Sequence, residues 1–200
     1  MGVRLAVLVS GGGTNLQALL DDPFIAPHIV VVVSDRPGVK ALDRAEAAGV
    51  PTVVIEVAED RTALSGEVAA VLHAHAVDAV VSAGYMRILG PEVVASYPDR
   101  WLNVHPALLP SFPGMHGVRD ALAYGVKVTG VTVHLVDEGV DTGPIVVQEA
   151  VEIRDDDDWN SLEARIHEVE HRLLPRAVRA LLQGRLVRDG RSVRIVEEER

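Results

Sequence analysis

Runs of aliphatic residues alternate with amphipathic segments along the first half of the chain. The runs are rich in valine, leucine and isoleucine, a pattern typical of strands buried on both faces of a parallel sheet. The sequence predicts such strands at Leu5–Val9, Ile29–Val33, Thr52–Ile55, Ala79–Ser82 and Leu102–Val104. The segments between them have helical spacing and are bounded by Gly, Pro, Asp or Asn. Helices are expected at Leu16–Leu20, Lys40–Ala48, Arg61–Ala76 and Pro91–Tyr97.

This alternation predicts an α/β fold of the Rossmann-like, doubly wound type, with a mostly parallel sheet and right-handed crossovers. From Lys127 onward the apolar residues recur at every second position, as at Val131 and Val133. Period two is the spacing of a strand with one buried face. A second strand is expected at Ile145–Val151, so the sheet should end in a mixed carboxy-terminal strand extension.

A long carboxy-terminal helix is expected over about Trp159–Gln183. The acidic run Asp155–Asp158 precedes it, and aspartates near the start of a helix are favoured by the positive end of its dipole. The run is therefore interpreted as a cap and not as a metal site. Beyond the helix, Val187–Ile195 alternates around Asp189-Gly190, a dipeptide typical of two-residue hairpin turns.

The composition fits a single domain over residues 1–200. Hydrophobic residues make up 48% of the 200 positions, and a chain of this size can bury about 70% of its unfolded surface. The absence of cysteine excludes disulfides, thiolate zinc ligands and cysteine nucleophiles. A formal net charge of −10 argues against a nucleic-acid partner, because such binding needs a broad basic surface.

Neither a membrane segment nor a secretory signal is indicated. The longest apolar runs, such as Ile29–Val33, are far shorter than the roughly 20 residues needed to span a bilayer. The first residues lead directly into a strand, without the charged and apolar regions of a signal peptide. A cytoplasmic location is expected, and a homodimer is the commonest assembly of soluble enzymes.

The segment Ser10–Leu16, after the first strand, reads Ser-Gly-Gly-Gly-Thr-Asn-Leu. Glycines permit positive φ, and the start of the next helix presents free N–H groups to an anion. Leu16 stands where a dinucleotide fingerprint has its third glycine, and no Gly-Lys-Ser/Thr follows as in a P-loop. Two interpretations stay open, a phosphate cradle and a tight strand-to-helix turn.

Several polar residues suit acid–base and oxyanion chemistry. Asn103 and His105 lie two residues apart, and so on one side of an extended strand, where an amide N–H and an imidazolium suit a developing oxyanion. Asp141 is either a turn residue or a partner that raises the pKa of His105 and transfers protons. His134 either orients this pair or is a buried histidine bonded to a backbone carbonyl.

A rival constellation is His167–His171, which matches the H-E-x-x-H pattern of zinc hydrolases. A zinc hydrolase needs a third ligand, and no histidine follows His171. The simpler interpretation is that the apolar residues of this helix pack inward while its charged residues face solvent. The inward residues would be Leu162, Ile166, Val169 and Leu173, and no metal is expected.

Four segments form a recognisable set when taken in order. They are Ser10–Leu16, Ala83–Leu89, Asn103–Pro110 and Asp141–Pro144. The third reads Asn-Val-His-Pro-Ala-Leu-Leu-Pro and the fourth Asp-Thr-Gly-Pro, and together they resemble the folate-dependent formyltransferases. The Gly-Thr-Asn loop and the Glu170-His171 pair make the chain most similar to the phosphoribosylglycinamide formyltransferase family.

The resemblance implies transfer of a formyl group from 10-formyltetrahydrofolate to the amine of phosphoribosylglycinamide, a step of purine (IMP) biosynthesis. Asn103, His105 and Asp141 would form the catalytic group, with His134 beside them. The amide and the protonated imidazole would stabilise the tetrahedral oxyanion, while Asp141 would keep His105 charged and help relay protons. Neither a covalent enzyme intermediate nor a metal is required.

The resemblance also implies two sets of binding residues. The phosphoribosylglycinamide set is Gly12, Gly13, Thr14, Asn15, Gly84, His116 and Glu170. The folate set is Arg61, Met86, Arg87, Ile88, Leu89, Asn103, Val140 and Asp141. The loop from Gly13 to Asn15 would hold the ribose phosphate, and Arg61 would lie near the glutamate tail.

Three other classes compete with this interpretation. Methionyl-tRNA formyltransferases carry an additional carboxy-terminal domain, and formyltetrahydrofolate deformylases an additional amino-terminal one, so the length of 200 residues disfavours both. A non-enzymatic phosphoribosyl-binding module would need the glycine loop alone. The presence of the Asn103, His105 and Asp141 set disfavours that module.

Overall fold

The computed structural model describes residues 2–56 and 60–196, and the chain forms two compact units, Met1–Asn103 and Val104–Arg200. Among the described residues, seven strands form one mostly parallel sheet in the order β3-β2-β1-β4-β5-β6-β7. This order confirms the prediction of a Rossmann-like α/β fold. The expectation of a single domain over residues 1–200 stays a prediction.

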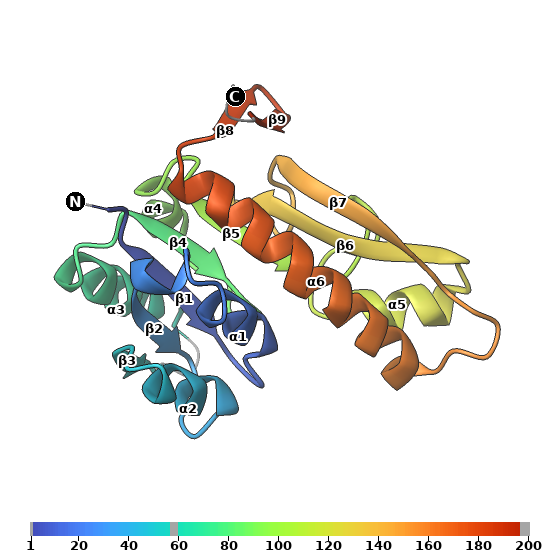
Figure 1. Cartoon of the computed structure of the whole chain (residues 1–200), viewed down its shortest axis with the longest axis horizontal. Coiled ribbons are helices and arrows are strands. Elements are labelled where there is room, and N and C mark those ends of the chain that lie inside the picture. Colours follow the sequence, from blue (N-terminus) through green and yellow to red (C-terminus); the bar gives the residue numbers. More distant parts are fainter. Residues whose placement is uncertain (1, 57–59, 197–200) are drawn as a thin grey trace. The chain divides into compact units, whose positions relative to one another are not determined.

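The first unit contains the parallel part of the sheet (Figure 1). Its strands are β1 (Leu5–Val9), β2 (Ile29–Ser34), β3 (Thr52–Val54) and β4 (Ala79–Ser82). Strand β5 (Trp101–His105) begins in this unit and ends in the second. Its helices are α1 (Thr14–Leu20), the 3₁₀ turn η1 (Ala26–His28), α2 (Lys40–Ala47), α3 (Arg61–Ala74) and α4 (Pro91–Ala95). Strand β1 pairs with β2 on one edge and β4 on the other, and all five of its residues are fully buried. The uninterrupted aliphatic runs therefore reflect strands covered on both faces.

The second unit contains an antiparallel pair and the long helix. Its elements are α5 (Gly117–Tyr124), β6 (Val128–Leu135), β7 (Ile145–Glu152), α6 (Trp159–Leu182), β8 (Leu186–Asp189) and β9 (Ser192–Ile195). Strands β6 and β7 pair antiparallel, which confirms the mixed extension. Helix α6 packs along both of these strands (Figure 1).

Helix α6 begins as the acidic run predicted. Asp158 is its N-cap, and its carboxylate accepts a hydrogen bond of 2.8 Å from the backbone N–H of Ser161. Asp157 forms an ion pair with Arg165, two turns further along. Local charge and capping therefore fix the start of the helix, while its buried stripe, which includes Leu162 and Ile166, holds it on the sheet.

Two local predictions were wrong. Helix α5 was not expected, although Gly125, which ends it with a φ of 81°, is a typical helix stop. The turn of the final hairpin was expected at Asp189-Gly190, but Asp189 pairs with Ser192. The central turn residues are therefore Gly190 and Arg191, because pairing across the turn, and not the dipeptide alone, sets its position.

Candidate functional site

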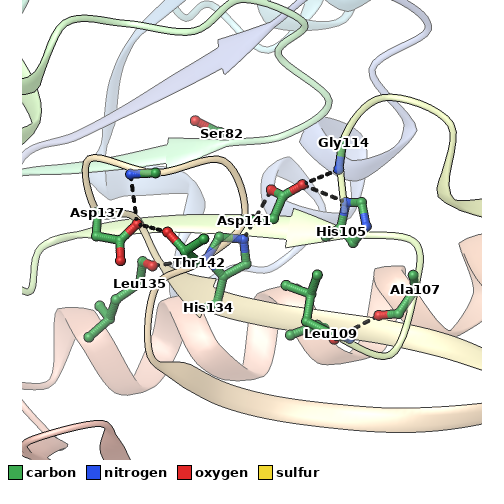
Figure 2. A network of polar contacts seen from close by, with 12 residues as sticks. Ser82, His105, Ala107, Leu109, Gly114, His134, Leu135, Asp137, Asp141 and Thr142 are labelled. Carbon is green, nitrogen blue, oxygen red and sulfur yellow. Dashed lines mark hydrogen bonds and ion pairs between the residues drawn. The ribbon is translucent and has the colours of Figure 1, made fainter. Parts of the chain in front are cut away.

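Asp141 lies between two histidines in the second unit (Figure 2). Its Oδ2 is 3.4 Å from Nδ1 of His105, and its Oδ1 is 3.5 Å from Nε2 of His134. His105 ends β5, His134 belongs to β6, and Asp141 lies in the loop between β6 and β7. The side chains of His105, His134 and Asp141 are 4%, 3% and 12% exposed, respectively. The structure thus brings together three of the predicted catalytic residues as a buried His–Asp–His cluster.

Backbone carbonyls determine which nitrogen of each histidine carries a proton. Nε2 of His105 lies 2.7 Å from the carbonyl oxygen of Phe112, and Nδ1 of His134 lies 2.9 Å from that of Leu135. A carbonyl only accepts hydrogen bonds, so both nitrogens must be donors. A ring that also donates a hydrogen bond to Asp141 must therefore carry protons on both of its nitrogens. His134 bonds a backbone carbonyl, as one of its two interpretations predicted, and it also faces Asp141, the position that the other interpretation, an orienting role, requires.

Burial and charge act in opposite directions on this cluster. Burial lowers the pKa of His105 below its ordinary value, although the Asp141 carboxylate and the Phe112 carbonyl act to raise it. Burial raises the pKa of Asp141, but hydrogen bonds from His134 and the Gly114 N–H, with the charge of His105, leave it lower than usual. Asp141 was expected to raise the pKa of His105 and keep it charged. It acts in that direction, but the desolvation of the ring outweighs it.

This arrangement predicts how stability depends on pH. The lowered pKa of His105 means that the unfolded chain takes up this proton first, so stability should fall as pH drops below about 6.5. The contribution of Asp141 is present above about pH 3.9 and is lost only as pH falls through its lowered folded-state pKa. We expect urea unfolding midpoints to drop more for the wild type than for His105→Gln between about pH 7.5 and about pH 5.5. Equal losses in the two proteins would contradict this account.

The loop that carries Asp141 is held by contacts that the sequence interpretation did not identify. The Asp137 carboxylate accepts hydrogen bonds from the Gly139 N–H at 3.1 Å and from the Thr142 hydroxyl at 2.6 Å. A side chain at Gly143 would place its Cβ 1.7 Å from the Leu135 carbonyl oxygen, so only glycine fits there. The role of Asp137 could have been inferred from its Asp-x-Gly spacing, which is typical of an Asx turn. Asp141 itself adopts a left-handed φ of 53°, which a loop fixed at both sides can impose.

The segment after β5 closes around His105. The Gly114 N–H donates a hydrogen bond of 2.7 Å to Oδ2 of Asp141, so the same oxygen faces both this N–H and His105. His116, a predicted substrate residue, is exposed and precedes α5 as its N-cap. A Cβ at Gly117 would lie 3.3 Å from Nε2 of His105. Gly117 is thus a further residue to which the sequence interpretation gave no role, since a side chain there would crowd the ring.

Asn103, the remaining predicted catalytic residue, lies on β5 two positions before His105. Alternate residues of a strand share a face, which confirms the placement of Asn103 on the same side as His105. Asn103 is only half-buried, whereas its neighbours Leu102 and Val104 are buried. The Asn103 amide therefore lies on the strand face that also carries the His105 imidazole.

The glycine loop of the first unit connects β1 to α1. Gly13 caps the helix with a φ of 70°, and a Cβ there would lie 2.6 Å from Cα of Ala41. Asn15 is buried in the first turn of α1. The Ser10 hydroxyl, just before the loop, accepts a hydrogen bond of 2.8 Å from the Met86 N–H. The loop is therefore a rigid turn joined to one of the predicted folate segments.

The segment from Gly84 to Leu89 follows β4 and begins with Gly84 at a φ of 76°. Met86 and Ile88 are exposed apolar side chains at 44% and 55%, whereas Leu89 is buried. The Arg61 guanidinium donates two hydrogen bonds, of 3.1 and 2.5 Å, to the Leu89 carbonyl. The structure thus brings Arg61 to the predicted folate segment. In the second unit, Val140 is a further exposed apolar residue of the predicted folate set, at 46%.

Glu170 occupies a position in the buried stripe of α6 and is only 5% exposed. The interpretation that all charged residues of this helix face solvent was therefore wrong for Glu170. Its carboxylate lies 3.9 Å from Nε2 of His167, whose ring stacks on that of His171. No group of three or more potential metal ligands is found among residues 2–56 and 60–196.

The chain is a Rossmann-like α/β protein, and its buried His–Asp–His cluster consists of groups suited to acid–base chemistry. The chain matches the formyl transferase family over residues 3–178. It is 48% identical over 202 aligned residues to the phosphoribosylglycinamide formyltransferase of Mycobacterium tuberculosis, covering 96% of this chain and 94% of that protein. The chain therefore belongs to the formyl transferase family.

Solved structures show the same relationship. Glycinamide ribonucleotide transformylase 1 from Symbiobacterium toebii superposes with a TM-score of 0.93 at 45% identity, covering 98% of this chain and 95% of that one. A formyltetrahydrofolate deformylase from Pseudomonas syringae superposes with a TM-score of 0.90 at 28% identity, covering 98% of this chain and 67% of that one. The fold is thus shared by a protein named as a transformylase and one named as a deformylase, so fold alone does not distinguish the two activities.

Within the described residues, no helix combines the length and the apolar character needed to cross a bilayer.

Proposed function

We propose that the protein transfers the formyl group of 10-formyltetrahydrofolate to the amine of phosphoribosylglycinamide, a step of purine biosynthesis. The observation that carries this proposal is the buried cluster in which Asp141 faces His105 and His134. The 48% identity to a phosphoribosylglycinamide formyltransferase supports the choice of acceptor. The phosphoribosylglycinamide and folate sets of residues remain part of the proposal.

The proposed reaction is a direct transfer. The neutral substrate amine attacks the formyl carbon, and the resulting tetrahedral oxyanion accepts hydrogen bonds from the Asn103 amide and the charged His105. The bond from that carbon to N10 of the folate then breaks, and the proton lost by the amine is transferred to N10. His105 and Asp141 relay this proton, since their facing atoms lie 3.4 Å apart.

The structure adds one requirement to this mechanism. Nε2 of His105 donates to the Phe112 carbonyl and Nδ1 faces Asp141, so both ring nitrogens are already engaged. A substrate oxygen that binds His105 must therefore replace the Phe112 carbonyl as the acceptor. The Nε2–H group of His105 would then exchange one oxygen acceptor for another, so it would not be left buried without a hydrogen-bond partner.

Folate binding is assigned to exposed apolar side chains beside polar backbone. Met86 and Ile88 offer an apolar surface for a flat ring, and Val140 offers another next to Asp141. Ligand sites commonly combine apolar walls with a few polar groups that fix orientation. Arg61 uses part of its guanidinium on the Leu89 carbonyl, and its remaining N–H groups are proposed to face the glutamate tail. A cytoplasmic location and a homodimer are also proposed.

The test follows the absorbance change as 10-formyltetrahydrofolate becomes tetrahydrofolate, with phosphoribosylglycinamide present, with it omitted, and with a zinc chelator added. Conversion that requires the nucleotide and is insensitive to the chelator is expected. Conversion without the nucleotide would indicate the hydrolase reaction named for the Pseudomonas syringae structure. No conversion, together with retained nucleotide binding, would indicate a binding module.

A further inference from the structure

Arg44, on α2, contacts the glycine loop directly. Its Nε donates a hydrogen bond of 2.9 Å to the Gly12 carbonyl, and its Nη1 donates one of 2.9 Å to Oε1 of Gln17 on α1. A single guanidinium therefore links the loop to the helix that follows it. The planar, rigid fork of arginine suits such two-point contacts better than a flexible ammonium does.

Helix α2 also holds the neighbouring carbonyl. The Ala41 N–H donates a hydrogen bond of 3.1 Å to the Gly11 carbonyl, so the carbonyls of Gly11 and Gly12 both bond to α2. In a planar trans peptide the carbonyl and the following N–H point in opposite directions. The N–H groups of Gly12 and Gly13 therefore point away from α2.

The first two glycines have free space where a side chain would lie. A Cβ added at Gly11 or at Gly12 would meet no atom within 4 Å. By contrast, Gly13 touches Ala41 closely, with 2.6 Å from its added Cβ to the Ala41 Cα. The loop is thus braced against α2 through two carbonyls and is uncrowded at Gly11 and Gly12. Two successive N–H groups directed away from α2 are an arrangement that favours phosphate binding.

We propose that Arg44 is a positioning residue for the phosphate of the ribonucleotide substrate. It holds the Gly12 carbonyl against α2 and so keeps the following N–H directed at the phosphate, while its charge adds to the attraction. This inference rests on the proposed function, in which the loop from Gly12 to Asn15 binds the ribose phosphate.

The test compares Arg44→Ala with Arg44→Lys and with the matched control Arg4→Ala. Arg4 makes the same kind of bond, from its Nε to the His75 carbonyl at 2.9 Å, away from the loop. Arg44→Ala should raise the KM for phosphoribosylglycinamide about 10-fold, a typical effect of losing one charged hydrogen bond. Its kcat and its KM for folate should stay within about twofold. The KM of Arg44→Lys for phosphoribosylglycinamide should lie between those of the wild type and Arg44→Ala, because one ammonium can reach Gly12 but cannot reproduce both bonds.

A dephosphorylated substrate separates this role from a merely structural one. The wild type should prefer the phosphorylated substrate, and Arg44→Ala should match the wild type in kcat/KM on the dephosphorylated one. If Arg44→Ala lowers kcat/KM by the same factor on both substrates, or on neither, the positioning role of Arg44 is overturned and the proposed function is not. A wild type that does not distinguish the two substrates would overturn the phosphate loop itself. Thermal melting of all four proteins checks that each is folded.

Discussion

Replacement of His105 with alanine is expected to lower kcat by about 10²- to 10⁴-fold, the usual contribution of a positioned acid–base group. One nitrogen of the ring faces the Asp141 carboxylate, and the other lies beside the Phe112 carbonyl. Its loss removes the donor proposed for the oxyanion and the partner for proton relay. Steady-state rates with saturating substrates measure the effect.

The alanine variant also leaves the half-buried Phe112 carbonyl without its donor, which should cost about 1 kcal/mol of stability. His105→Gln serves as a second variant, because an amide N–H can still bond that carbonyl but cannot become charged. Both variants should have a low kcat, and the melting temperature of His105→Gln should be closer to that of the wild type than the melting temperature of His105→Ala is. His73→Ala, at an exposed position of α3, is the control. Near-normal turnover in either His105 variant would rule out the mechanism.

Replacement of Asp141 with asparagine is expected to lower kcat by a similar factor of about 10²–10⁴. Asparagine keeps an oxygen for the Gly114 N–H, which donates to Asp141 at 2.7 Å, so the loop should keep its conformation. It loses the negative charge that acts against the desolvation of His105. The pKa of His105 should therefore fall further, and less of the ring should be charged at neutral pH.

The effect of Asp141→Asn on kcat should depend on pH. In the wild type the carboxylate raises the pKa of His105, so the ring stays charged to a higher pH than in Asp141→Asn. The ratio of wild-type to variant kcat should therefore narrow as pH is lowered. Asp155→Asn, which changes an exposed carboxylate paired with Lys127, should have neither effect. A ratio that stays constant with pH would show that Asp141 does not act through the charge of His105.

Several features of the fold were predictable because they depend on local pattern. Strands β1 and β4 have the bounds that their aliphatic runs predicted, since runs of 5 and 4 residues rich in valine suit a strand and are too short for a typical helix. Helix ends were less predictable. Helix α3 ends at Ala74 and not at Ala76, because Ala76 takes a φ of 46° as the chain turns toward β4.

The candidate site was predictable to the level of residue types. Asn103 and His105 share a face by strand geometry alone, and the motif resemblance indicated Asp141. The partners of these groups were not predictable. The Phe112 carbonyl, the Gly114 N–H and the backbone of Gly117 reach His105 or Asp141 only because the chain folds back after β5.

The strand and helix alternation, the chemical types at the site and the resemblance to a formyltransferase family could be inferred from the order of residues. Those properties depend on neighbours in the chain and on motif order. The hydrogen-bond partners of His105 and His134, the burial of Glu170 and the bracing of Gly12 by Arg44 became visible only in the folded chain. Each of these depends on which groups from distant segments exclude water or donate hydrogen bonds at one place, and sequence spacing does not specify that.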